Sequence, residues 1–117
     1  MKRVWWVILI IGLLDSCIHA PVIPQQEISF RSDVQPIIAG NCQQSGCHGS
    51  TDFQKFPLVT YDDVIKNGEI KSGDANHSKL YKVLNGNDDD LMPPSGKLTV
   101  KQLYTIEFWI DQGAKNN

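Results

Sequence analysis

The chain has little net charge, few cysteines and no long run of charged residues. Its 117 residues include 11 basic and 13 acidic side chains, for a formal charge of −2. This balance does not suggest a nucleic-acid partner or a charged, disordered tail. No segment shows the alternation of apolar and polar residues that is typical of β-strands. The near-neutral charge argues against a nucleic-acid-binding protein. The absence of strand patterns favours a small all-α domain.

The amino terminus carries the features of a signal peptide. Lys2 and Arg3 precede an unbroken apolar run from Val4 to Leu14. Such a run is too short to span a bilayer as a mature helix, but it is typical of the core of a secretory signal. We therefore expect residues 1–16 to be removed from the mature protein.

The apolar run ends in Leu14-Asp15-Ser16-Cys17, which resembles a bacterial lipobox. The resemblance implies that Cys17 becomes the acylated first residue, and more than one acyl chain gives stable membrane anchoring. Residues 17–29 contain Pro21 and Pro24 without periodicity, which predicts an extended tether. The predicted location is extracytoplasmic, in a bacterial periplasm or at the cell surface. Ordinary cleavage nearby and an uncleaved anchor are the alternatives.

The most informative stretch is Cys42-Gln43-Gln44-Ser45-Gly46-Cys47-His48. A His directly after the second Cys is typical of covalent haem attachment, in which both thiols form thioethers and the imidazole binds the iron. The usual spacing has two residues between the cysteines, whereas this chain has four. Ser45-Gly46 suits the turn that a longer spacer requires. With Cys17 at the processing site, no cysteine pair is left for a structural disulfide.

A helix is predicted to lead into this motif. Ser32 and Gln35 fit a capping box, so we expect the helix to begin at Ser32 and to run into Cys42. Its apolar stripe comprises Val34, Ile37 and Ile38. Ala39 and Gly40 are small enough for a second helix to cross closely there, unless the helix ends at Gly40.

Three further helices are expected after the motif, each with a start and a stop signal. They span about Tyr61 to Asn67 after Thr60, Ser78 to Gly86, and Thr99 to Gly113. The last begins with a capping box formed by Thr99 and Gln102. The apolar positions of the last two helices are Leu80, Val83, Leu84, Leu103, Ile106 and Ile110, with Trp109 beside them.

Two irregular segments flank the predicted haem. Gly49 to Pro57 has no periodicity, and its only large apolar side chains are Phe53 and Phe56. These rings would cover the porphyrin or pack as ordinary core. Asp88-Asp89-Asp90 is interpreted as a solvated loop, with docking of a basic redox partner as the alternative.

If His48 binds one face of an iron, the other face needs a second ligand, for which the chain offers Met92, His77 and His19. Met92 is the only methionine after the signal peptide, and it precedes two prolines that stiffen its loop. Its thioether is a soft, neutral ligand that favours ferrous iron. A core-filling role for Met92 and a capping or solvent-facing role for His77 are the alternatives, and His19 lies in the tether.

Together these residues resemble a planctomycete-type cytochrome c domain, one of the single-haem, class I-like cytochromes, over about Phe30 to Ala114. The resemblance is carried by Val34, Pro36, Ile37, Cys42, Cys47, His48, Gly49, Ser78, Leu80, Tyr81, Met92-Pro93-Pro94, Trp109-Ile110 and Gly113-Ala114. It implies that residues 30–117 form a small helical wrap around one covalent haem c, with the first and last helices crossing beside the haem. It also implies thioethers from the two motif cysteines and axial iron ligation by His48 and Met92.

This ligand set predicts electron transfer rather than enzymatic catalysis, because an iron with two protein ligands has no open position for a substrate. The expected partners are redox proteins and, through the lipid on Cys17, a membrane; no oligomeric state is predicted. Two other interpretations remain. One is a haem protein in which a gas or peroxide displaces Met92. The other is a zinc or disulfide module without haem, using the motif's thiols and imidazole, with His77 available as a fourth zinc ligand.

Overall fold

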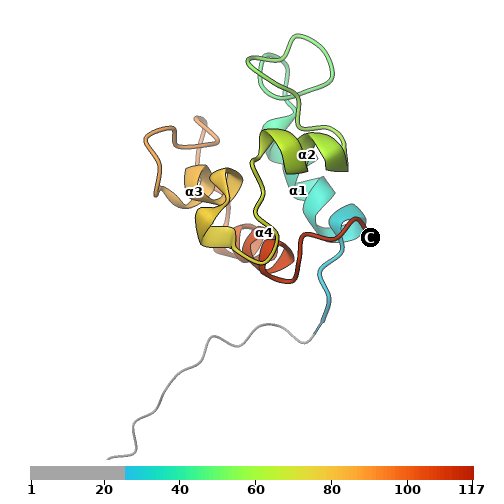
Figure 1. Ribbon diagram of the computed structural model, residues 1–117. Coiled ribbons are helices and arrows are strands. Elements are labelled where there is room, and N and C mark those ends of the chain that lie inside the picture. The colour runs from blue at the N-terminus through green and yellow to red at the C-terminus, as the bar shows by residue number, and fades with distance from the viewer. Residues whose placement is uncertain (1–25) are drawn as a thin grey trace, which may run out of the picture.

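The computed structural model describes residues 26–117, and this part of the chain is helical, without β-strands, as predicted. The predicted signal peptide, the lipidation site at Cys17 and His19 lie outside the described residues. The elements are the π-helical turn η1 (Phe30–Val34), α1 (Gln35–Cys42), α2 (Tyr61–Asn67), the 3-10 turn η2 (Ala75–His77), α3 (Lys79–Asn85) and α4 (Val100–Asp111) (Figure 1). Among residues 26–117, no helix is long and apolar enough to cross a membrane.

η1 and α1 are continuous and together form the N-terminal helical segment, residues 30–42, which begins earlier than predicted. Ser29 is the N-cap, and its hydroxyl accepts a hydrogen bond from the Ser32 N–H. The Asp33 carboxylate accepts a hydrogen bond from the Ser29 N–H at 2.8 Å, which completes a reciprocal cap. The predicted box of Ser32 and Gln35 is therefore wrong, because an equally good pair of capping side chains lies just upstream and competes for the same role.

The N-terminal helical segment contacts α4 through η1 rather than through small residues of α1. Phe30 packs against Trp109 and Tyr61, with ring centroids 5.4 and 5.2 Å apart. Ala39 and Gly40 are exposed, and a Cβ built at Gly40 would meet no other part of the protein within 4 Å. The expected close crossing at these residues is wrong, because the aromatic contact buries far more apolar surface. The helix does continue past Gly40 into the motif.

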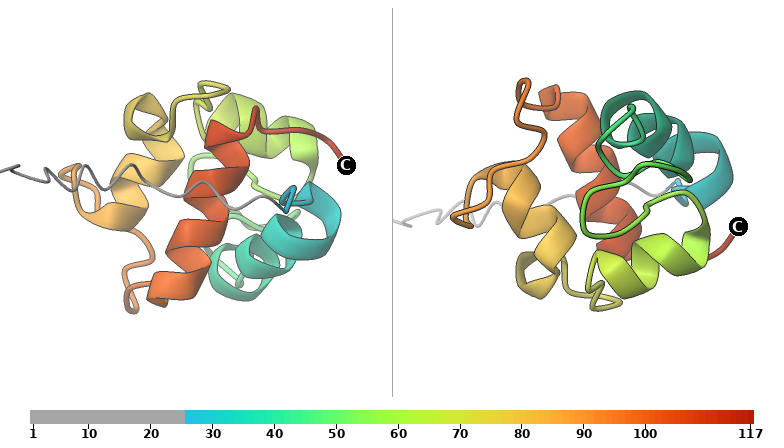
Figure 2. Two further views of the ribbon diagram at one scale, coloured as in Figure 1. Left: turned by 90° about the horizontal axis from the view of Figure 1, so that it is seen from below. Right: turned by 90° about the horizontal axis from the view of Figure 1, so that it is seen from above.

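The other three helices lie where the sequence predicted them. Thr60 and Thr99 each close a reciprocal capping box, with Asp63 and Gln102 respectively. α3 ends at Gly86, whose φ of 86° is a left-handed conformation that suits glycine. In Figure 2, α4 lies between α3 on one side and the N-terminal helical segment on the other. The buried core comprises Phe30, Val34, Ile38, Leu58, Val64, Ala75, Leu80, Tyr81, Val83, Leu84, Ile106, Trp109, Ile110 and Ala114.

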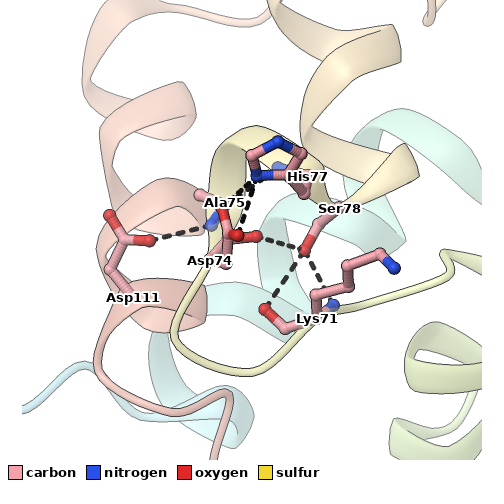
Figure 3. Close-up of polar contacts among 6 residues, drawn as sticks. All are labelled: Lys71, Asp74, Ala75, His77, Ser78 and Asp111. Atoms are coloured by element: carbon pink, nitrogen blue, oxygen red, sulfur yellow. Dashed lines mark hydrogen bonds and ion pairs between the residues drawn. The ribbon is translucent and has the colours of Figure 1, made fainter.

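The turn that leads into α3 is held by the fully buried Ser78. Its hydroxyl accepts a hydrogen bond from the Lys71 N–H at 2.8 Å and donates one to the Asp74 carbonyl at 2.9 Å (Figure 3). Asp111 in α4 accepts a hydrogen bond from the Ala75 N–H at 2.8 Å, which ties η2 to the end of α4. Ser78 precedes α3 as predicted, but its side chain fastens the preceding turn instead of capping the helix.

Candidate functional site

Two adjoining cavities lie between the cysteine motif, α3 and the loop that carries Met92. Their volumes are about 160 and 240 Å³, and Cys42, His48, Lys55 and Met92 line both. Cys47 lines the larger one. Both cavities are partly open to solvent. The structure thus gathers the four predicted site residues of the described chain around one shared space.

The smaller cavity is walled mainly by apolar side chains. These belong to the inner side of α3 and to the segment after the motif, and they comprise Phe56, Leu58, Leu80, Val83 and Leu84. Four charged residues, Lys55, Glu69, Lys79 and Asp90, also line it. A largely apolar hollow with a few polar groups is typical of a cofactor site.

His48 is oriented by two contacts with Phe56. Its Nδ1 lies 2.8 Å from the Phe56 carbonyl oxygen, and the two rings stack with centroids 4.8 Å apart. A carbonyl only accepts hydrogen bonds, so Nδ1 carries the proton and Nε2 is the nitrogen available to a metal. The His48 backbone is also held, since its N–H donates to the Cys42 carbonyl at 2.9 Å and its carbonyl accepts from the Leu58 N–H at 2.8 Å. A ring that is held through one nitrogen in this way is suited to bind a metal through the other.

The four-residue spacer of the motif forms a tight turn. The Cys47 N–H donates to the Gln44 carbonyl at 2.9 Å, and Gly46 has a φ of 75°, so the predicted turn is confirmed. Just after the motif, the chain passes so close to the spacer that a Cβ at Gly49 would lie 3.0 Å from the Gln43 carbonyl oxygen. The turn of the spacer therefore depends on two glycines: Gly46 adopts a left-handed conformation, and Gly49 allows a close approach of the backbone to Gln43.

Both motif cysteines are partly buried free thiols. Burial and, to a smaller extent, the neighbouring Cys47 together raise the pKa of Cys42 to about 11. The Cys42 thiol is therefore protonated at neutral pH. Within residues 26–117, no three His, Cys, Asp or Glu side chains are grouped as ligands of one metal ion.

Met92 is presented by a loop that is attached to α3. Its N–H donates a hydrogen bond to the Val83 carbonyl at 2.9 Å, and the next residue, Pro93, is buried. Met92 itself is half-buried and packs against the core. The position of its side chain therefore depends on α3 as well as on the proline pair that follows it.

His77 lies outside both cavity linings. Its Nδ1 is 2.8 Å from the Asp74 carboxylate and its side chain is 71% exposed (Figure 3). The solvent-facing role that was the alternative for His77 is confirmed. Phe53 is likewise exposed and lines neither cavity, so of the two phenylalanines expected to cover a porphyrin only Phe56 is at the site.

The acidic loop is mostly solvated, as predicted. Asp89 and Asp90 are exposed, whereas Asp88 forms an ion pair with Lys79 at 2.7 Å. The hydrogen bond between these two side chains lowers the pKa of Asp88 and raises the pKa of Lys79. This pair closes the loop onto the start of α3, beside the smaller cavity.

Sequence reasoning missed three contributors to the site. The Phe56 carbonyl, the Leu58 side chain and Lys55 all reach it from the aperiodic segment after the motif. No local pattern could have identified them, because their positions follow from how that segment folds back on His48. The chain matches no protein-family profile, no curated protein and no solved structure. A functional assignment therefore depends on the residues and geometry of this site.

Proposed function

We propose that the protein is a membrane-anchored, single-haem c-type cytochrome that transfers electrons. In this proposal Cys42 and Cys47 hold the haem through thioethers, and the iron is bound by His48 Nε2 and the Met92 sulfur. The observation that carries the proposal is the convergence of Cys42, His48 and Met92 on the same two cavities. Cys42 and His48 belong to one motif, whereas Met92 comes from a distant loop, and a thiol, an imidazole and a thioether around one space are the groups that hold a haem c.

The residues present suit such a group. The Nε2 atom of His48 is available because Nδ1 is bonded to a carbonyl, and Met92 offers a soft sulfur from the loop that is attached to α3. The apolar wall of the smaller cavity matches the apolar surface of a porphyrin. When bound, haem supplies a one-electron couple between ferric and ferrous iron.

The chain's own groups would set the properties of that couple. The hydrogen bond from His48 Nδ1 to Phe56 fixes the ring and increases its strength as a ligand. The apolar side chains of the smaller cavity keep water away, which disfavours the more highly charged ferric state. The Met92 sulfur acts in the same direction, because a thioether stabilises ferrous iron. We therefore expect a raised reduction potential.

The cellular setting follows from the amino terminus. A signal peptide over residues 1–16 and acylation of Cys17 would place the domain outside the cytoplasm and attach it to a membrane. Its partners would be redox proteins that dock near the haem. No catalytic residue is proposed.

An optical spectrum after acid–acetone extraction tests this proposal. Haem that stays with the polypeptide is covalently attached, and the α-band of the reduced form reports one thioether or two. Met92→Ala should remove the weak sulfur-to-iron charge-transfer band at the red end of the oxidised spectrum, and His48→Ala should abolish the low-spin spectrum. His77→Ala is the matched control, because His77 lies outside the site, and it should leave both features unchanged.

The alternatives give different results in the same preparation. A folded, colourless protein would refute the proposal, and stoichiometric zinc in it would favour the metal module. Rapid binding of carbon monoxide by the reduced protein at neutral pH would favour the reading in which Met92 is displaced. Retention of the charge-transfer band in Met92→Ala would exclude Met92 as a ligand.

A further inference from the structure

The outer face of α4 carries an apolar stripe that is exposed in the described part of the chain. Val100 is 69% exposed and Tyr104 is 52% exposed. Phe108, which is half-buried, stacks on Tyr104 with ring centroids 5.9 Å apart. Residues four apart share one side of a helix, so these three form a line, named here the outer stripe, that points away from the buried Ile106 and Ile110. α4 lies across the near side of the domain when it is seen from below (Figure 2, left).

The described chain enters the domain at one end of the outer stripe. Gln112 follows Phe108 by one helical turn, and its side-chain amide donates a hydrogen bond to the Gln26 carbonyl at 3.1 Å. The same amide accepts a hydrogen bond from the Ile28 N–H at 2.8 Å. Cys17 precedes Gln26 by nine residues, which span at most about 30 Å when fully extended. An acyl group on Cys17 would thus hold this face of the domain close to the lipid.

The chemistry of the stripe suits the surface of a bilayer. Tyr104 combines an apolar ring with a polar hydroxyl, as side chains at membrane interfaces commonly do. Lys97 and Lys101 are exposed at the start of α4, where they can approach anionic headgroups. Two carboxylates lie further along α4: Glu107 interacts with the Tyr81 hydroxyl, and Asp111 accepts a hydrogen bond from the Ala75 N–H. The positive charge is therefore confined to the N-terminal end of the stripe, at the two lysines.

We propose that the outer stripe, together with Lys97 and Lys101, rests on an anionic lipid bilayer and sets the orientation of the anchored domain. The inference depends on the lipid anchor of the proposed function. Neither cavity of the described chain is lined by a residue of α4. α4 and the loop that follows α1 lie at opposite ends of the domain in Figure 1. Docking through α4 therefore turns that loop, which carries Cys47 and His48, away from the membrane.

A weak contact is enough for this purpose. The anchor keeps the stripe within reach of the bilayer, so its local concentration is high and no independent strong binding is required. A lysine near an anionic surface contributes about a fivefold preference, which is enough to favour one face of an anchored domain.

Hydroxyl-radical footprinting of the full-length, lipidated protein tests the inference, with oxidation of each side chain read by mass spectrometry. The protein is placed on vesicles of phosphatidylglycerol and phosphatidylcholine and compared with the Cys17→Ser chain in buffer. Oxidation of Tyr104 and Phe108 should fall several-fold on the vesicles. Oxidation of Phe53, which is exposed in the loop at the other end of the domain, should be unchanged.

A charge reversal provides a second measurement. Lys101→Glu should reduce the protection of Tyr104 about fivefold or more, because it replaces an attraction to the headgroups by a repulsion. Lys66→Glu is the matched control, since it makes the same change at an exposed lysine in the last turn of α2. It should leave the protection of Tyr104 as it is.

Several outcomes would overturn the inference. Equal oxidation of Tyr104 on vesicles and in buffer would show that the stripe faces water. Low oxidation of Tyr104 in the Cys17→Ser chain without vesicles would mean that another part of the chain, or a second copy, covers the outer stripe. If vesicles protected Phe53 from oxidation as much as Tyr104, the domain would have no preferred orientation through α4. If Cys17 carried no acyl group, the anchor on which the inference depends would be absent.

Measurements on the same samples distinguish failure of this inference from failure of the proposed function. Covalent haem is read from the mass of the motif peptide. Acylated protein with a protected Tyr104 but no haem would refute the electron carrier and support the membrane face. Haem-loaded, acylated protein with an unprotected Tyr104 would refute the membrane face alone.

Discussion

The two halves of this domain are built differently. The framework half, formed by the N-terminal helical segment, α2 and α4, is centred on Trp109, which is fully buried and packs against Phe30 and Tyr61. The site half, formed by α3 and the loops 43–57 and 86–98, contributes Leu80, Tyr81, Val83 and Leu84 to the core but also borders two partly open cavities. The framework is stabilised by its own packing, whereas under the proposed function a bound haem would complete the packing of the site half.

The largest effect should follow from removing the centre of the framework. In Trp109→Ala, the buried ring is lost and the Lys115 carbonyl loses the indole N–H that bonds it at 3.0 Å. We expect a loss of about 5 kcal/mol in the free energy of unfolding, which is most of the stability of a small domain. Urea unfolding followed by circular dichroism measures it. Tyr104→Ala, on the exposed face of the same helix, should change little, and equal losses in both variants would contradict the picture of a packed framework.

A somewhat smaller effect should distinguish the haem-loaded chain from the same chain made without haem. Haem would bury the apolar wall of the smaller cavity, so without haem we expect the free energy of unfolding to fall by about 3 kcal/mol. Hydrogen exchange should show that this loss is concentrated in α3 and in the two loops, with slow exchange kept in α4. Uniform loosening of all helices in the haem-free chain would show that the two halves are not separable.

Replacing one glycine in each half by alanine should change the stability of the domain in opposite directions. At Gly49, a Cβ would lie 3.0 Å from the Gln43 carbonyl oxygen, so Gly49→Ala should destabilise the domain by about 1–3 kcal/mol. Gly40 is exposed in α1 and has open space around it, so Gly40→Ala should stabilise the helix by about 0.5–1 kcal/mol. Thermal unfolding of the two variants beside the parent measures both changes. If Gly49→Ala were stabilising, the backbone at Gln43 would have to move easily, and the close approach would not be a constraint.

The smallest predicted effect concerns a helix cap in the framework. The Thr60 N–H lowers the pKa of Asp63 through the capping box. A carboxyl whose pKa is lowered on folding contributes stability above its unfolded pKa of about 3.9, and that contribution is lost as the pH falls through the folded pKa. Asp63→Asn should therefore flatten the acid limb of the stability profile slightly, because the group is largely exposed. Asp62→Asn removes the same charge outside the capping box and should leave that limb unchanged.

The sequence predicted the helices of both halves better than their packing. α2 and α4 begin with capping boxes and α3 ends at a left-handed glycine, and these signals act within a few residues. The start of the N-terminal helical segment was misplaced because two sets of capping side chains compete there, and only the burial of Phe30 favours the earlier one. The crossing with α4 was misplaced for a related reason, since small residues permit a close contact without requiring it.

By itself, the sequence determined the helices, the cysteine–histidine motif and the choice of Met92 as the candidate partner of His48, because periodicity, capping and spacing are local properties. Tertiary structure decided which groups meet. It placed Met92 and His48 on the same cavities, bonded His48 to the Phe56 carbonyl and left the outer stripe of α4 exposed. Such contacts join residues far apart in the chain, and they form only when the packing of the whole core selects one arrangement among the many that the local signals permit.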